Sequence, residues 1–179
     1  MKKIILVYGI VSGVIVIGSA ILSVNLMSGS THLAGLEWLG YLIMLIALSV
    51  IFIGIKRYRD NESGGVIRFW KALQVGLGIS VVAGLVYVVA WEANLAATDY
   101  RFIDDYNASV IQEVREAPDA TPEKIEEAIA SAAVMKERYD NPGFRLPMTF
   151  LEIFPVGFLI SLISAAVLRN PGVMPARVT

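Results

Sequence analysis

Cysteine is missing from this sequence of 179 residues, and histidine occurs only once, at position 32. The lack of cysteine excludes disulfides, thiolate zinc sites, iron–sulfur clusters and cysteine nucleophiles. A single histidine cannot build a multi-histidine metal or haem site within one chain. We therefore expect no cofactor. The net charge of −1 gives the whole chain no bias toward nucleic acid, so we expect no nucleic-acid partner.

Charged residues are also scarce, since they make up 17% of the chain while 56% is hydrophobic. A soluble domain is nearer to about one quarter charged. The apolar residues gather in four long runs, at about 4–27, 36–55, 72–91 and 146–168. A hydrocarbon core about 30 Å thick needs ~20 helical residues, and none of the runs alternates like a strand. The sequence therefore predicts an all-α polytopic membrane protein with four transmembrane helices.

The first run could instead belong to a cleaved signal peptide. An apolar signal core covers only about 7–15 residues, whereas this run continues to Met27. We therefore expect an uncleaved first span.

Basic residues predict the orientation of these spans. They precede the first run, separate the second from the third and follow the fourth, whereas residues 28–35 contain none. The positions concerned are Lys2, Lys3, Lys56, Arg57, Arg59, Arg68, Lys71, Arg169 and Arg177. Basic loops stay inside, so we expect both termini in the cytoplasm and the long loop 93–145 outside.

The loop 93–145 has the pattern of a helical hairpin inserted between spans three and four. Apolar residues recur at helical spacing from Ile103 to Val114. Thr121 is a good N-cap for a second helix, with Pro122 at its first position. That helix should end near Tyr139 and carry Ile125, Ile129, Ala132 and Tyr139 on one face. The two stripes pack against each other, or the hairpin binds a partner; the sequence leaves both open.

Small residues recur every fourth position in spans three and four. Residues four apart share one helix face, and small side chains let two helices approach closely. The predicted packing residues are Gly76, Ser80, Gly84, Gly157 and Ser161. Their partner is another span of the same chain or a second copy of it.

Two acidic residues lie in or beside the apolar runs. Glu152 is inside span four, three residues before Pro155, and Glu92 closes span three on the same side. Ionisable residues in a span are candidate functional sites, and Pro155 should kink the helix. One hypothesis is that the two carboxyls share a proton or capture a cation. The alternative is that each meets a hydroxyl or the headgroup layer separately.

Three stretches of the chain resemble the DUF4199 family of small bacterial membrane proteins. They are residues 58–72 with Gly64-Gly65 and Phe69-Trp70-Lys71-Ala72, residues 87–92, and residues 150–165 with Phe150-Leu151-Glu152-Ile153-Phe154-Pro155-Val156-Gly157. The resemblance implies four-helix membrane topology and a bacterial origin. The family has no assigned function, so the resemblance implies no substrate, cofactor or site residue.

Two classes of function follow from these observations. The first is a non-enzymatic structural or accessory protein of the bacterial cytoplasmic membrane, which binds a membrane-protein partner or itself. The second is a small oligomeric transporter or channel that uses Glu152 and Glu92. We do not expect an enzyme, because the spans lack a Ser–His, His–Asp or metal-binding set.

Overall fold

The computed structural model of the protein describes residues 1–27 and 37–176. These residues form seven α-helices and no strand, which confirms the all-α prediction. The helices are α1 (Lys2–Met27), α2 (Glu37–Leu48), α3 (Val50–Glu62), α4 (Phe69–Ala97), α5 (Phe102–Glu116), α6 (Pro122–Asp140) and α7 (Pro142–Leu168). The turn expected at 28–35, the start of the second span, His32 and Arg177 lie outside the described residues.

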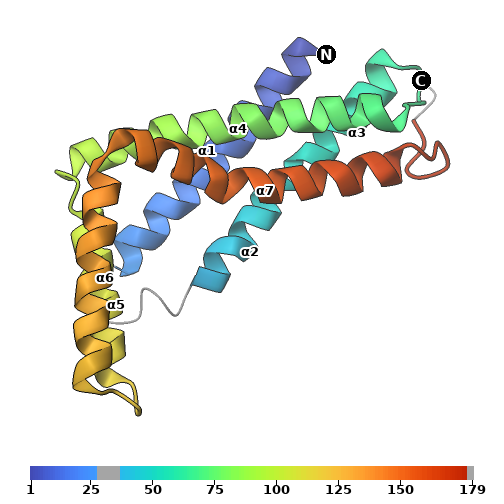
Figure 1. The fold of residues 1–179 in the computed structure, drawn as a ribbon. Helices are drawn as coiled ribbons and strands as arrows, with labels where there is room; N and C mark the ends of the chain where they lie inside the picture. The colour runs from blue at the N-terminus through green and yellow to red at the C-terminus, as the bar shows by residue number, and fades with distance from the viewer. Residues whose placement is uncertain (28–36, 177–179) are drawn as a thin grey trace.

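Four helical segments are long and apolar enough to cross a membrane, as the sequence predicts. They are Lys2–Ser23, Gly40–Glu62, Phe69–Ala97 and Pro142–Leu168. Helix α4 packs against both α1 and α7, and α3 also contacts all three. Both chain ends lie at one end of this assembly and the α5–α6 hairpin lies at the other (Figure 1). We call these the terminal end and the hairpin end.

The second span is longer than its apolar run and is interrupted. A break at Ser49 separates α2 from α3, and the Ser49 hydroxyl donates to the Ile46 carbonyl at 2.6 Å. Helix α3 continues past residue 55, where the apolar run ends, to Glu62. Polar residues continue a helix beyond the hydrocarbon when they pair along its face. Here Lys56 forms an ion pair with Asp60, one turn further on.

The third and fourth spans also extend beyond their apolar runs. Helix α4 continues past residue 91 to Ala97, and α7 begins at Pro142 rather than near 146. Asn141 both ends α6 and caps α7, since its side chain accepts a hydrogen bond from the Gly143 amide at 2.9 Å. Asn141 is therefore the single residue between α6 and α7, and no loop separates the two helices at the predicted break, 141–143.

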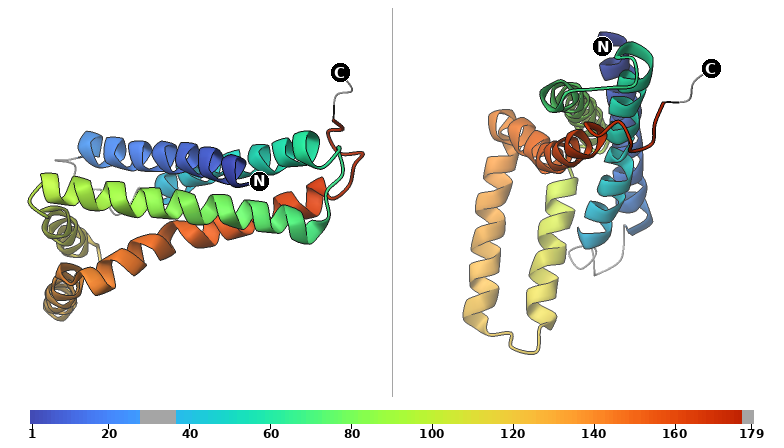
Figure 2. Two further views of the ribbon diagram at one scale, coloured as in Figure 1. Left: turned by 90° about the horizontal axis from the view of Figure 1, so that it is seen from above. Right: turned by 90° about the vertical axis from the view of Figure 1, so that its right-hand side faces the viewer.

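The hairpin consists of α5 and α6, which run crosswise to α4 and α7 (Figures 1 and 2). Thr121 caps α6 as predicted, and its side chain accepts from the Lys124 amide at 3.3 Å. The helices contact each other, with the Asn107 amide donating to the Ala132 carbonyl at 3.0 Å. Of the residues predicted on one face of α6, Ile125, Ala132 and Tyr139 are half-buried, whereas Ile129 is 45% exposed.

The small residues of spans three and four form a seam between α4 and α7 of the same chain. The Ser80 and Ser161 hydroxyl oxygens lie 3.1 Å apart across it. A Cβ added at Gly84 would lie 2.6 Å from the Phe150 ring, and one at Gly157 would lie 2.9 Å from the Ser80 hydroxyl oxygen. A Cβ at Gly76 would lie 2.8 Å from Ser161. Of the two partners that the sequence left open, these residues contact the same chain.

Candidate functional site: a cavity at the hairpin end

A cavity of about 700 Å³ lies between the spans toward the hairpin end. Its volume is within the range of small-molecule sites, about 300–1,000 Å³. Residues of α1, α2, α4 and α7 form its sides, and residues of α5 and α6 add to its lining. Most of these side chains are apolar. Six of the seven helices of the described residues thus help to build this pocket.

Aromatic side chains form much of the cavity lining. They are Tyr41, Tyr87, Trp91, Phe102, Tyr106 and Tyr139. Trp91 stacks on Tyr87 with ring centroids 6.4 Å apart and meets Phe102 edge-on at 4.9 Å. Its indole nitrogen donates to the Tyr139 hydroxyl at 3.0 Å. These contacts join α4, α5 and α6 into one aromatic wall, which we define as Tyr87, Trp91, Phe102 and Tyr139.

Glu152 lies on α7 and faces this cavity. Its side chain is exposed, although neighbouring helices flank it. Tyr87 of the aromatic wall lines the same cavity and lies near the carboxyl. Among the described residues that line the cavity, Glu152 is the one with a charge. The sequence-predicted Glu152 therefore lies in a site with the properties of a binding pocket.

Pro155 lines the same cavity one turn further along α7. Helix α7 continues through Pro155 without a break. Because proline has no amide hydrogen, the carbonyl one turn earlier, at Leu151, has no helical donor. Pro155 thus leaves an acceptor oxygen one residue from Glu152.

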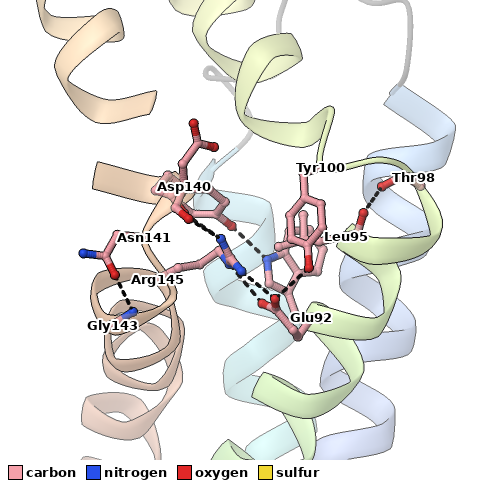
Figure 3. A network of polar contacts seen from close by, with 10 residues as sticks. Glu92, Leu95, Thr98, Tyr100, Asp140, Asn141, Gly143 and Arg145 are labelled. Carbon is pink, nitrogen blue, oxygen red and sulfur yellow. Dashed lines mark hydrogen bonds and ion pairs between the residues drawn. The ribbon is translucent and has the colours of Figure 1, made fainter. Parts of the chain in front are cut away.

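Glu92 forms an ion pair with Arg145 and is not a partner of Glu152. Arg145 reaches from the start of α7 to α4, where its Nε and Nη2 atoms lie 2.9 and 2.5 Å from the two carboxylate oxygens (Figure 3). Its remaining nitrogen, Nη1, donates to the Tyr139 carbonyl at 2.7 Å. The Arg145 side chain is only 4% exposed. This bidentate pair holds the ends of α4 and α7 together beside the cavity.

The turn between α4 and α5 brings a tyrosine onto this ion pair. Asp99 and Tyr100 have φ angles of 53° and 56°, and the Tyr100 amide donates to the Leu95 carbonyl at 2.8 Å. This is a Schellman closure of α4, although non-glycine residues adopt such angles at a cost. The Tyr100 ring lies 4.9 Å from the Arg145 guanidinium, and its hydroxyl donates to Glu92 at 3.0 Å. That hydrogen bond raises the pKa of Tyr100.

The two predicted carboxyls have different surroundings. Glu92 pairs with Arg145 and accepts a hydrogen bond from Tyr100, whereas Tyr87 lies near Glu152. Arg145 is a partner that neither hypothesis from the sequence included. Sequence reasoning missed Arg145, although a signal existed: a Glu closes one span and an Arg opens the next, and the hairpin returns the second span beside the first.

Sequence reasoning also missed Arg59, which was treated as a loop cation. This side chain is 0% exposed. It donates to the Asp60 carboxylate at 2.8 Å and to the carbonyls of Val173 and Met174 at 2.9 and 2.5 Å. Arg59 thus attaches the segment after α7 to α3 at the terminal end. Tyr58-Arg59-Asp60 was part of the family resemblance, which was the available signal.

Comparison with known proteins agrees with the architecture. The sequence model of the family described as "Protein of unknown function (DUF4199)" matches residues 7–170, which include most of the first span, the other three spans and the hairpin. Neither the curated proteins nor the solved structures include a match to the chain. With most of its length matched, this membrane-spanning chain belongs to the DUF4199 family.

Proposed function

We propose that this protein is a non-enzymatic accessory protein of the membrane that binds a small, membrane-soluble molecule in the cavity at its hairpin end. The cavity itself carries this proposal. It has the volume of a ligand site, an apolar and aromatic lining, and one carboxyl able to orient an occupant.

The exposed residues of the cavity lining favour entry of a ligand from the bilayer. Tyr41 of α2 and Met148 and Leu151 of α7 line the cavity and are also among the exposed apolar side chains of the spans. These side chains form an apolar surface that extends from the outside of the spans into the cavity. An apolar molecule dissolved in the membrane could therefore enter sideways without crossing water.

The polar groups of the cavity favour binding over catalysis. The hydroxyls of Ser19 and Ser23 donate to carbonyls one turn earlier, at 2.7 and 2.8 Å, so they serve the helix. Glu152 has a tyrosine but no histidine, lysine or second carboxyl beside it among the described lining residues. A nucleophile with its activating base is thus missing from this part of the chain. A transporter that relays ions from Glu152 to Glu92 has less support, since Arg145 neutralises Glu92.

Saturable photolabelling tests the proposal. We expect a long-chain alcohol carrying a diazirine to label the cavity-lining residues of the purified protein, and the unlabelled alcohol to suppress the labelling. Ala20→Phe should fill part of the cavity and reduce the labelling. The control Leu159→Phe adds a ring on the exposed part of α7, outside the lining, and should have no effect. Labelling that is not saturable, or that Ala20→Phe leaves unchanged, would refute the proposal.

We also propose that the hairpin end faces outward in the bacterial cytoplasmic membrane and that both chain ends face the cytoplasm. The basic residues at the terminal end, such as Arg57, Lys71 and Arg169, support this orientation. Because the chain has no cysteine, single cysteines can report each side. An impermeant maleimide should label Ala120→Cys in intact cells and should label Asn61→Cys only after the membrane is opened. The reverse result would invert the orientation.

A second candidate function is self-association through the hairpin. Ile129, Val134 and Met135 of α6 are apolar and exposed. Exposed apolar surface of this kind marks interaction sites when it forms a patch. Native mass spectrometry should then detect a dimer that Val134→Glu converts to monomer. A wild-type protein that is monomeric at all concentrations would exclude this candidate.

A further inference from the structure

We propose that the occupant of the cavity is an organic cation, with an ammonium head between Glu152 and the aromatic wall and an apolar body along α7. This inference rests on the proposed function and adds the chemical class of the ligand. Three features of the described residues support it: the charge of the lining, the chemistry of the aromatic wall and the separate neutralisation of the neighbouring ion pair.

The charge of the lining favours a cation over an anion or a neutral molecule. Glu152 supplies a carboxyl, and no lysine or arginine is among the described residues that line the cavity. Glu152 lies within a membrane span, where a charged side chain is costly unless it has a partner or reaches a water-filled cavity. An ammonium group would supply the missing counter-charge. An anion would be repelled, and a neutral ligand would leave the carboxyl without a charged partner.

The aromatic wall combines π faces with two tyrosine hydroxyls, which can accept as well as donate hydrogen bonds. The single N–H group of Trp91 is already donated to the Tyr139 hydroxyl. Aromatic faces attract cations, and groups of them bind alkylammonium ligands in other proteins. The chain already uses one of these rings in this way, since the Arg145 guanidinium lies 5.8 Å from the centre of the Tyr139 ring. A second cation on the cavity side would use the same chemistry.

The buried cation nearest to the wall does not compete for Glu152. Arg145 is held by both oxygens of Glu92 and by the Tyr139 carbonyl. Glu92 therefore neutralises the charge of Arg145, and this charge does not serve as a partner for Glu152. Metal ions are less suited to the site than an organic cation, because no cluster of three or more potential ligands occurs among the described residues. One carboxyl with apolar neighbours fits a ligand that brings its own apolar body.

Binding of three probes with the same chain length tests the inference. The protein, in an uncharged maltoside detergent, is titrated with dodecyltrimethylammonium, dodecanol and dodecyl sulfate below their micelle concentrations. Tryptophan fluorescence and the unfolding temperature report binding. We expect the ammonium probe to bind more tightly than the alcohol and the sulfate to bind least. Equal affinity for the alcohol and the ammonium would overturn the inference while preserving the proposed function, and no binding of any probe would overturn both.

Glu152→Gln provides the decisive variant. It keeps the shape of the side chain and removes its charge, so it should weaken binding of the ammonium probe about tenfold or more and leave binding of the alcohol unchanged, because the attraction between the carboxylate and the quaternary ammonium is lost. Glu126→Gln is the matched control, since it removes the same charge from the exposed surface of α6. Glu152→Asp should retain part of the preference. An unchanged ammonium affinity in a folded Glu152→Gln protein would refute the ammonium–carboxyl contact.

The membrane itself distinguishes two sources of the ammonium group. If lipid headgroups occupy the site, phosphatidylethanolamine in nanodiscs will compete with dodecylamine, and phosphatidylglycerol will not. If a free amine is the occupant, dodecylamine will bind equally in both. Failure of dodecylamine to bind in phosphatidylglycerol nanodiscs would refute the ammonium site for either source.

Discussion

Helices α4 and α7 meet in two different ways along one shared face. Toward the middle, the helices leave no room for a Cβ at Gly84 or Gly157, which would lie 2.6 Å from the Phe150 ring or 2.9 Å from the Ser80 hydroxyl oxygen. Toward the hairpin end, the same side of α4 carries Tyr87 and Trp91, which line the cavity. Side-chain size at the contact sets how closely two helices approach. The change from small to aromatic residues along one face therefore separates a packing region from a binding region.

Two buried arginines mark the ends of this arrangement, and they differ in what they bind. Arg145 binds a carboxylate on another span, whereas Arg59 binds mainly backbone carbonyls of the segment after α7. The first joins two membrane helices, and the second attaches a chain end. Substitutions at the two arginines and at two positions of the seam between α4 and α7 should destabilise the protein to different extents, from the largest expected effect to the smallest.

Arg145→Met should cause the largest loss of stability. It leaves Glu92, whose side chain is 30% exposed, without its cationic partner, and it removes three hydrogen bonds of the guanidinium. Hydrogen bonds to charged groups contribute about 1.5–3 kcal/mol each. The measurement is reversible unfolding of the purified protein in mixed micelles. Lys136→Met is the control, because Lys136 pairs with Asp104 on the exposed hairpin, where such pairs contribute about 0–1 kcal/mol. Equal losses in the two variants would contradict the buried status of the Arg145–Glu92 pair.

Arg59→Met should release the segment 170–176 from α3. The carbonyls of Val173 and Met174 lose their donors, and hydrogen bonds to charged groups contribute about 1.5–3 kcal/mol each. Limited proteolysis should then remove the C-terminal residues faster than in the wild type. Arg57→Met, which changes an exposed arginine of the same helix, should leave the cleavage rate unchanged. Equal cleavage of both variants would mean that Arg59 does not hold this segment.

Gly84→Leu should loosen the seam between α4 and α7. Its side chain would collide with the Phe150 ring, and overpacking commonly costs about 1–3 kcal/mol. Val89→Leu enlarges a residue of the same helix that is 70% exposed, so it should change the unfolding free energy little. The two variants are compared by thermal unfolding in detergent. A Gly84→Leu protein as stable as Val89→Leu would show that the seam tolerates a wider helix separation.

Ser80→Ala should have the smallest effect, although Ser80 is buried. It removes the contact with the Ser161 hydroxyl but preserves the small size of the residue. Hydrogen bonds between membrane helices contribute about 0.6 kcal/mol on average. We therefore expect a shift in the unfolding midpoint close to the measurement limit. A loss as large as that of Gly84→Leu would mean that hydrogen bonding, rather than close approach, stabilises the seam.

The parts of the site that the sequence predicted are those with a local signal. Glu152 is recognisable because a carboxyl in an apolar run is unusual, and Gly84 and Gly157 because small residues recur at helical spacing. For Arg145 and Arg59, the neighbouring residues do not indicate burial. Each lies at the margin of an apolar run, where arginine is ordinary, and only their partners on other helices make them buried.

The sequence by itself determined the number of spans, the hairpin and its Thr121 cap, because hydrophobic length and helix capping depend on neighbouring residues. The tertiary structure alone decided that Glu92 meets Arg145 and that the seam closes within one chain. Both outcomes depend on contacts between residues 50 or more positions apart. The cavity at the hairpin end belongs to the same class, because six helices build it and no single segment contains its pattern.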